Sequence, residues 1–169
     1  MALKPQRHEF KTDTSFFMNE VAERGGVATI STVGSGEAYD QSQALVSYAA
    51  EPSGAQPVGV LLNDMVNIDQ TRQHINWHKD EVIIGGKVTL LQQGFVVTNW
   101  IDPASTPAAS DYAYVTMSGY LTSKPRNANN PEASPLVGRF LSAKDTDGYA
   151  KVEVNLPQPM VLGNKNDTP

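Results

Sequence analysis

The chain has 169 residues, of which 40% are hydrophobic and 18% charged, and this balance predicts one ordinary folded domain rather than a disordered segment. It contains no cysteine, which excludes disulfides and thiolate chemistry. The net charge is −5, no apolar run is long enough to span a bilayer and no signal peptide is recognisable, so we expect a soluble protein without a membrane partner.

The charge is unevenly distributed along the chain. The first 11 residues have a net charge of +2, because they contain Lys4, Arg7 and Lys11 but only one acidic residue, Glu9. The remaining residues carry 10 basic and 17 acidic side chains, which gives them a net charge of −7. A basic arm on an acidic body is poorly suited to nucleic acid, which requires a basic face with stacking aromatic residues, and it suits an arm that docks on another protein.

The first candidate element follows this arm. Ser15 can cap a helix over residues 16–24 that Gly25-Gly26 would end, so the sequence predicts at most one short helix. An extended TSFFMN (14–19) is the alternative, because nine residues form only a marginal helix by themselves. In either case the apolar FFM must be buried on the domain itself or on a neighbouring chain.

The chain from residue 26 to residue 156 consists of short runs rich in Val, Ile, Thr, Tyr and Leu, separated by Gly and Pro. This pattern predicts an all-β fold, a small sandwich or barrel-like body. We expect an arm in residues 1–25, the β body in residues 26–156 and a flexible C-terminal tail in residues 157–169. The expected strands are GVATIST (26–32), QALVSYAA (43–50), PVGVLLN (57–63), GKVTLLQ (86–92), GFVVTNWI (94–101), DYAYVT (111–116), YLTS (120–123), LVGRFLS (136–142) and YAKVEVNL (149–156).

Glycines mark the expected connections between these runs. Gln93-Gly94 predicts a hairpin turn between two runs, and Ser118-Gly119 and Asp147-Gly148 predict two further turns. A weak internal similarity relates PVGVLLND (57–64) to PLVGRFLSAKD (135–145), since each strand opens with Val-Gly. A glycine inside a strand indicates a bulge or a close backbone approach.

The stretch HINWHKDE (74–81) resembles half of a metal site, because His74 and His78 are four residues apart. Its apolar residues, however, alternate with polar ones, which is the period of a strand. On a strand, positions four apart lie roughly 13 Å from each other and cannot hold one ion. We therefore expect no metal site, and a metal-binding use of His74, His78 and Glu81 is the alternative.

Other catalytic or ligand-binding patterns are weak. KDTDG (144–148) resembles the start of a calcium loop, but the first ligand position falls on Ala143, and a β-turn explains the same residues. No nucleophile elbow or phosphate-binding loop occurs, so we expect neither an enzyme nor a cofactor. Spacing selects no catalytic pair among Asp64, Asp69, Asp80 and Glu81. The aromatic residues Trp77, Trp100, Tyr112 and Tyr114 could line a sugar groove, but in a sheet protein such residues are more often in the core or at an interface.

The pattern of turns and strands over residues 10–156 resembles the small β-rich head decoration proteins, or capsid cement proteins, of tailed bacteriophages. The succession runs through GGVATIST, PVGVLLND, GGKVTLLQQGFVVTN, AASDYAYVTMSGYLTS and LVGRFLSAKDTDGYAKVEVNL. The C-terminal half carries most of it, with Asp111, Tyr114, Gly119, Leu121-Thr122, Val137-Gly138, Val152, Val154 and Leu156.

The resemblance implies a non-enzymatic virion protein that binds the outer surface of the expanded capsid. Proteins of this family hold neighbouring major-capsid subunits together, often as trimers, and their N-terminal arms commonly lie on the capsid. We therefore expect the major capsid protein as partner, a homotrimer on the capsid, no contact with nucleic acid, and a soluble form in the host cytoplasm before assembly. The alternatives are a tail- or fibre-associated β protein and a small metal- or ligand-binding β-barrel.

The charge split and the apolar cluster, rather than the resemblance, indicate which residues would contact the capsid: Lys4, Arg7, Phe10, Phe16 and Phe17. If the arm is the docking element, deletion of residues 1–14 should abolish capsid binding and leave the unfolding of the body nearly unchanged.

Overall fold

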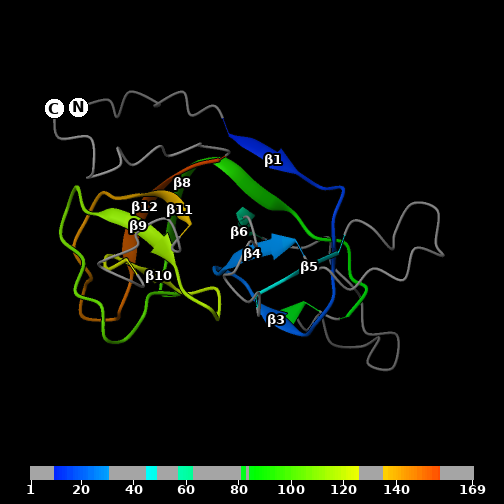
Figure 1. Ribbon diagram of the computed structural model, residues 1–169, viewed down its shortest axis with the longest axis horizontal. Coiled ribbons are helices and arrows are strands. Elements are labelled where there is room, and N and C mark those ends of the chain that lie inside the picture. The colour runs from blue at the N-terminus through cyan, green and yellow to red at the C-terminus, as the bar shows by residue number, and fades with distance from the viewer. Residues whose placement is uncertain are drawn as a thin grey trace, which may run out of the picture.

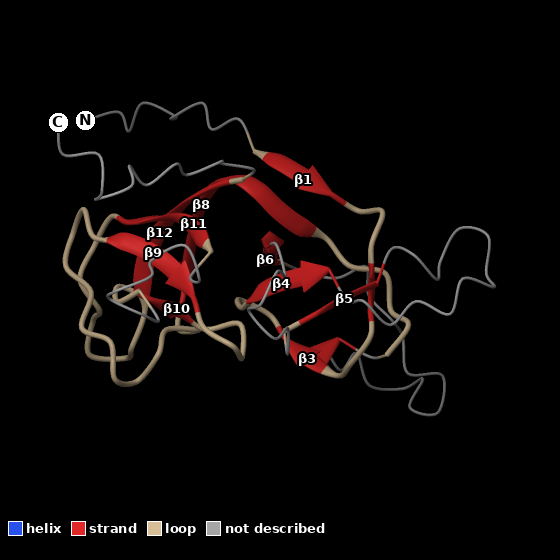
Figure 2. Ribbon diagram, viewed as in Figure 1, coloured by secondary structure: helices blue, strands red, loops and turns tan. Residues whose placement is uncertain are grey.

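The structure is a computed structural model and describes residues 10–30, 45–48, 57–62, 81–82, 84–125 and 135–156. Within these residues every regular element is a strand (Figure 2), so the prediction of an all-β body is confirmed. The strands are β1 (Lys11–Asp13), β2 (Phe17–Met18), β3 (Ala22–Glu23), β4 (Val27–Ile30), β5 (Leu45–Ser47), β6 (Pro57–Leu61), β7 (Glu81–Val82), β8 (Leu90–Thr98), β9 (Tyr112–Val115), β10 (Leu121–Thr122), β11 (Leu136–Phe140) and β12 (Ala150–Asn155).

Most of the described strands belong to one sheet, in the order β10-β9-β11-β12-β8-β6-β4-β5-β2, with β1 also paired to β8. β2 and β5 run parallel, and the other pairs of this sheet are antiparallel. β8 links the two halves, because Leu90 and Leu91 pair with β6 while residues 93–98 pair with β12. Figure 1 shows the two resulting lobes, β9–β12 on one side and β3–β6 on the other.

At residues 27–28, 60–61 and 90–91, the strands β4, β6 and β8 are buried on both faces. Successive side chains of a strand point to opposite faces, and here they enter two different cores. Val27, Val60 and Leu91 pack in the first core, in the lobe of β9–β12, and their neighbours Ala28, Leu61 and Leu90 pack in the second. Each of these six residues is at most 1% exposed. Burial on both faces explains why apolar residues are adjacent at these three places instead of alternating with polar ones.

The expected hairpin at Gln93-Gly94 is wrong, because β8 runs through both residues as one strand. Gly94 has a φ of 144°, a backbone conformation that residues with side chains rarely adopt. A Cβ atom at this position would lie 2.5 Å from a ring carbon of Phe10. The glycine therefore permits the close approach of a phenylalanine to a continuous strand.

The helix considered for residues 16–24 does not form, and the extended alternative does. The backbone is instead hydrogen-bonded to residues 85–88: Met18 N donates to Gly86 O at 2.9 Å and Val88 N donates to Phe16 O at 3.0 Å. Met18 is fully buried in the second core. Burial of the FFM cluster by the body thus outweighs the weak helical preference of nine residues.

Residues 11–25, which were expected in the arm, contribute β1, β2 and β3 and so belong to the folded body. In β1, Lys11 lies opposite Gln93, and in β12 Asn155 lies opposite the same Gln93. The first described strand therefore begins, and the last described strand ends, at one place on β8. The assignment of residues 157–169 to a tail stays a prediction, because they lie outside the described residues.

Both strand-internal glycines of the two similar segments permit a close approach, as predicted. A Cβ atom on Gly59 would lie 2.8 Å from the Leu90 Cβ, and one on Gly138 would lie 1.8 Å from the carbonyl oxygen of Glu153. The strand register also shifts beside each of them, in the pairing of β6 with β4 and of β11 with β9. The glycines let neighbouring backbones approach more closely than any side chain would allow.

The other two expected turns are confirmed. In KDTDG, Gly148 N donates to Asp145 O, and the Asp145 carboxylate accepts hydrogen bonds from Asp147 N at 3.0 Å and Tyr149 N at 2.7 Å. This carboxylate therefore closes a turn, as the β-turn interpretation predicted. The turn at Gly119 reaches the other lobe, where its carbonyl oxygen accepts a hydrogen bond from Val27 N at 2.9 Å.

Candidate binding site

The structure separates the residues that were predicted to contact a capsid. Phe10 is exposed over 56% of its surface and lies against Gly94. Phe16 packs against the second core, and Phe17, in β2, forms an isolated backbone β-bridge with Lys87. Both side chains are half-buried in the body. Lys4 and Arg7 lie outside the described residues. Of the three phenylalanines, only Phe10 presents most of its side chain to a partner.

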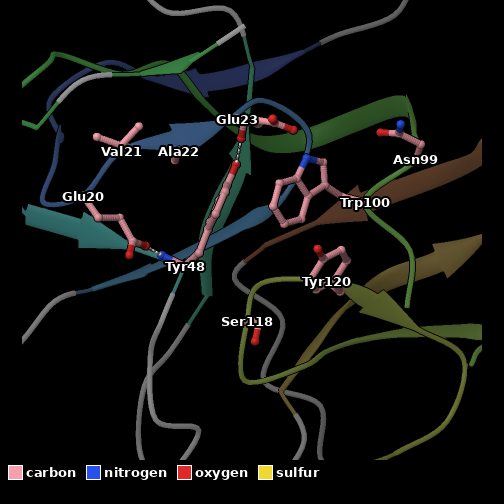
Figure 3. A pocket seen from close by; sticks show the side chains of 9 residues that line it. All are labelled: Glu20, Val21, Ala22, Glu23, Tyr48, Asn99, Trp100, Ser118 and Tyr120. Atoms are coloured by element: carbon pink, nitrogen blue, oxygen red, sulfur yellow. Dashed lines mark hydrogen bonds between the residues drawn. The ribbon is translucent and has the colours of Figure 1, made fainter. Parts of the chain in front are cut away.

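A pocket of about 770 Å³ lies where the two lobes meet (Figure 3). This volume is in the range of small-ligand sites. Three segments that are distant in sequence form most of it: the segment of β3 and its preceding loop, the residues after β8, and the turn between β9 and β10. Its lining includes the side chains of Glu20, Glu23, Tyr48, Trp100, Ser118 and Tyr120.

Three aromatic rings form a continuous row in this pocket. The ring centroids of Tyr48 and Trp100 are 5.1 Å apart, and those of Trp100 and Tyr120 are 4.5 Å apart. Tilted arrangements at such distances are favourable because the positive edge of one ring meets the negative face of another. Tyr48 is only 7% exposed, whereas Trp100 and Tyr120 are half-buried, so the last two rings offer part of their surface to a ligand.

The glycine pair Gly25-Gly26 allows this row to form. A Cβ atom on Gly26 would lie 2.7 Å from the Tyr48 ring, and one on Gly25 would lie 2.8 Å from the Trp100 ring. The Tyr48 hydroxyl donates a hydrogen bond to Glu23 O and accepts one from Gly26 N at 3.2 Å. The pair that was expected to end a helix instead holds two aromatic rings against the backbone.

Burial raises the pKa of Tyr48 far above its ordinary value, and the Gly26 N–H bond offsets this in part. The phenol therefore stays protonated at all physiological pH values and remains a hydrogen-bond donor to Glu23 O. A tyrosine held in this state fixes the site in place and is unsuited to act as a general base.

Two carboxylates lie at opposite ends of the Tyr48 side chain in Figure 3. Glu20 accepts a hydrogen bond from Tyr48 N through Oε1, which holds this carboxylate at the pocket. Glu23 is exposed at the rim. Among the described residues that line the pocket there is no lysine or arginine, so its charged groups are all negative.

Metal-binding groups do not gather in the part of the chain that the structure describes. Within these residues no three His, Cys, Asp or Glu side chains lie close enough to hold an ion. His74, His78 and the Glu81 side chain lie outside them, as do Asp64, Asp69 and Asp80. Nor does any helix in the described ranges have the length and apolar character needed to cross a membrane.

The sequence matches no known family model and no curated protein. What the pocket can bind must therefore follow from its own residues.

The aromatic set proposed from the sequence is not the one that the fold brings together. Tyr112 and Tyr114 pack against each other in β9, with ring centroids 6.5 Å apart, and Trp77 lies outside the described residues. Trp100 pairs instead with Tyr48 and Tyr120. No spacing rule relates positions 48, 100 and 120, because the sheet order and the Gly119 turn bring them together. The one available signal was the Gly-Gly pair, which marks a close approach as well as a helix end.

Proposed function

We propose that the chain is a structural protein of a bacteriophage virion that decorates the outer surface of the expanded head and stabilises the lattice of the major capsid protein. The proposal extends the resemblance of the sequence pattern to head decoration proteins, and it includes a homotrimer on the capsid and no enzymatic activity.

The observation that supports the proposal is the place where the first described strand begins and the last described strand ends. Lys11, the first residue of β1, and Asn155, the last residue of β12, both lie opposite Gln93 on β8. A decoration protein requires a rigid body from which terminal segments reach a neighbouring subunit on the same side. Segments that become ordered on contact can cover a wide surface, and many copies on one shell add avidity to modest contacts.

Immunogold labelling of intact virions from the source, with antibody raised against this chain, tests the proposal. We expect dense labelling over the head, because a decoration protein is present in many copies. Label confined to the tail would overturn the head assignment in favour of a tail- or fibre-associated protein. Absence of label on every particle would overturn the virion assignment itself.

Removal of residues 1–9 is expected to weaken binding to undecorated heads by more than about ten-fold, because Lys4 and Arg7 are lost and the acidic body remains. The melting temperature of the isolated chain should stay within roughly 2 °C of that of the full chain, because β1 begins at Lys11. Co-sedimentation with heads and scanning calorimetry measure the two quantities. A cut after residue 14 is unsuitable, since it also removes β1 from its pairing with β8.

The matched control removes residues 157–169, a segment of similar length in which the charges of Lys165 and Asp167 cancel. It should affect binding less than removal of residues 1–9 does. Undiminished binding by the chain that lacks residues 1–9 would contradict the role of the arm.

A further inference from the structure

We propose that the pocket between the two lobes binds the cationic end of a basic side chain, the guanidinium or ammonium group of an Arg or Lys residue on a partner protein. This inference goes beyond the role in the head and does not depend on it. It concerns a surface formed by Trp100, Tyr120 and Glu23.

The aromatic rings supply the first part of the recognition. A cation within about 6 Å of a ring centroid is attracted to the negative face of the ring, and Trp is the strongest partner. Trp100 and Tyr120 are half-buried and line the pocket, and their centroids are 4.5 Å apart. Two adjacent rings offer an apolar surface for the stem of a long basic side chain as well as for its charged end.

Hydrogen bonds fix the backbone of the two residues that carry these rings before any ligand arrives. Leu121 N donates to Trp100 O at 2.8 Å, and Trp100 N donates to the Thr98 hydroxyl at 3.0 Å. Tyr120 N donates to the Thr116 hydroxyl at 3.1 Å, and Thr116 N donates to Tyr120 O at 2.8 Å. A ligand therefore does not need to order the residues that carry the rings, which favours affinity.

The carboxylates supply the second part. Glu23 lies at the rim in an exposed position, and its backbone carbonyl is held by the Tyr48 hydroxyl. Glu20 contributes a second negative charge from the other end of Tyr48 (Figure 3). The adjacent Arg24 lines a neighbouring hollow rather than this pocket. A guanidinium or ammonium group complements a pocket whose charged groups, among the described lining residues, are all negative and whose walls include aromatic rings.

The first experiment uses nuclear magnetic resonance of the full chain. Loss of one indole N–H signal in Trp100→Phe assigns the signal of Trp100. Nα-acetyl-arginine amide is then titrated against its uncharged counterpart Nα-acetyl-citrulline amide. We expect the Trp100 signal to shift as the arginine compound binds with a Kd on the order of 1 mM. The citrulline compound should bind at least about five-fold more weakly.

The second experiment removes the charge at the rim. Glu23→Gln keeps the shape of an exposed side chain and should weaken arginine binding by about two- to five-fold at low salt. The matched control is Asp147→Asn, which removes one exposed charge from the turn before β12 and should leave the affinity unchanged. Raising the salt concentration to about 0.5 M should weaken binding to the full chain and reduce the difference between the full chain and Glu23→Gln.

Three results would overturn the inference. The first is an arginine compound that leaves the Trp100 signal unmoved up to about 20 mM. The second is an equal response to arginine and citrulline, which would show that charge is not recognised. The third is a response to methyl glucoside with none to arginine, which would make the aromatic row a platform for sugars. Arginine binding that is unaffected by Glu23→Gln would remove Glu23 from the site.

Discussion

Replacement of Gly138 by alanine should lower the free energy of unfolding by roughly 3–5 kcal/mol or prevent folding altogether. Gly138 lies opposite Val154 on β12 and Ala113 on β9, so it is enclosed by backbone on both sides. An added Cβ would lie 1.8 Å from Glu153 O, whereas Cβ atoms essentially never approach such an atom within 3.0 Å. The strands would have to separate and lose the hydrogen bonds between β11 and β12. Urea denaturation followed by circular dichroism measures the effect.

The matched control for this substitution is Gly148→Ala. Gly148 has a φ of 86° and an added Cβ would meet no atom within 4 Å. Alanine there is disfavoured only by the left-handed backbone conformation, which costs about 1 kcal/mol. Equal unfolding free energies for the two variants would contradict the close contact between β11 and β12.

Truncation of Phe140 to alanine should reduce the free energy of unfolding by about 3–5 kcal/mol. Phe140 is fully buried and is the largest such side chain of the first core. Its loss removes a ring from contact with side chains of several strands and leaves a cavity that the surrounding strands fill only in part. For a chain of this size the melting temperature should fall by roughly 6–20 °C, which scanning calorimetry measures.

Phe10→Ala provides the comparison for Phe140→Ala. The same truncation at a residue that is 56% exposed should cost about 1 kcal/mol or less. A loss of stability at Phe10 as large as that at Phe140 would contradict the burial of Phe140 in the first core. Phe140→Leu should recover most of the lost stability, because leucine fills much of the cavity.

The strands of this protein were predictable because apolar, β-branched runs and turn residues are local signals. The positions of β4, β6, β9, β11 and β12 follow the expected runs closely. The close approaches at Gly59 and Gly138 were also predictable, since a glycine has few other reasons to stand inside an apolar strand.

The failures share one physical cause, which is that a glycine serves turns, helix ends and close contacts equally well. Gly94 was interpreted as a hairpin turn, but it lies inside β8 against Phe10. Gly25-Gly26 was interpreted as a helix end, but it faces the rings of Tyr48 and Trp100. Which of these uses applies depends on a partner far away in the sequence, and local patterns carry no information about that partner.

The pocket was unpredictable for the same reason. Tyr48, Trp100 and Tyr120 come from different segments, and the Gly119 turn brings the last of them to the other lobe through its bond to Val27. Contacts of this kind depend on sheet order, which the sequence pattern leaves open.

The burial of β4, β6 and β8 on both faces at residues 27–28, 60–61 and 90–91 has a consequence for how the molecule unfolds. Each of these strands contributes side chains to both cores. Val27, Val60 and Leu91 pack in the first core, and Ala28, Leu61 and Leu90 pack in the second. If one core opens, the shared strands lose half of their packing and the other core is exposed to water. We therefore expect the two lobes to melt in a single cooperative transition, without a stable partly folded state of either lobe.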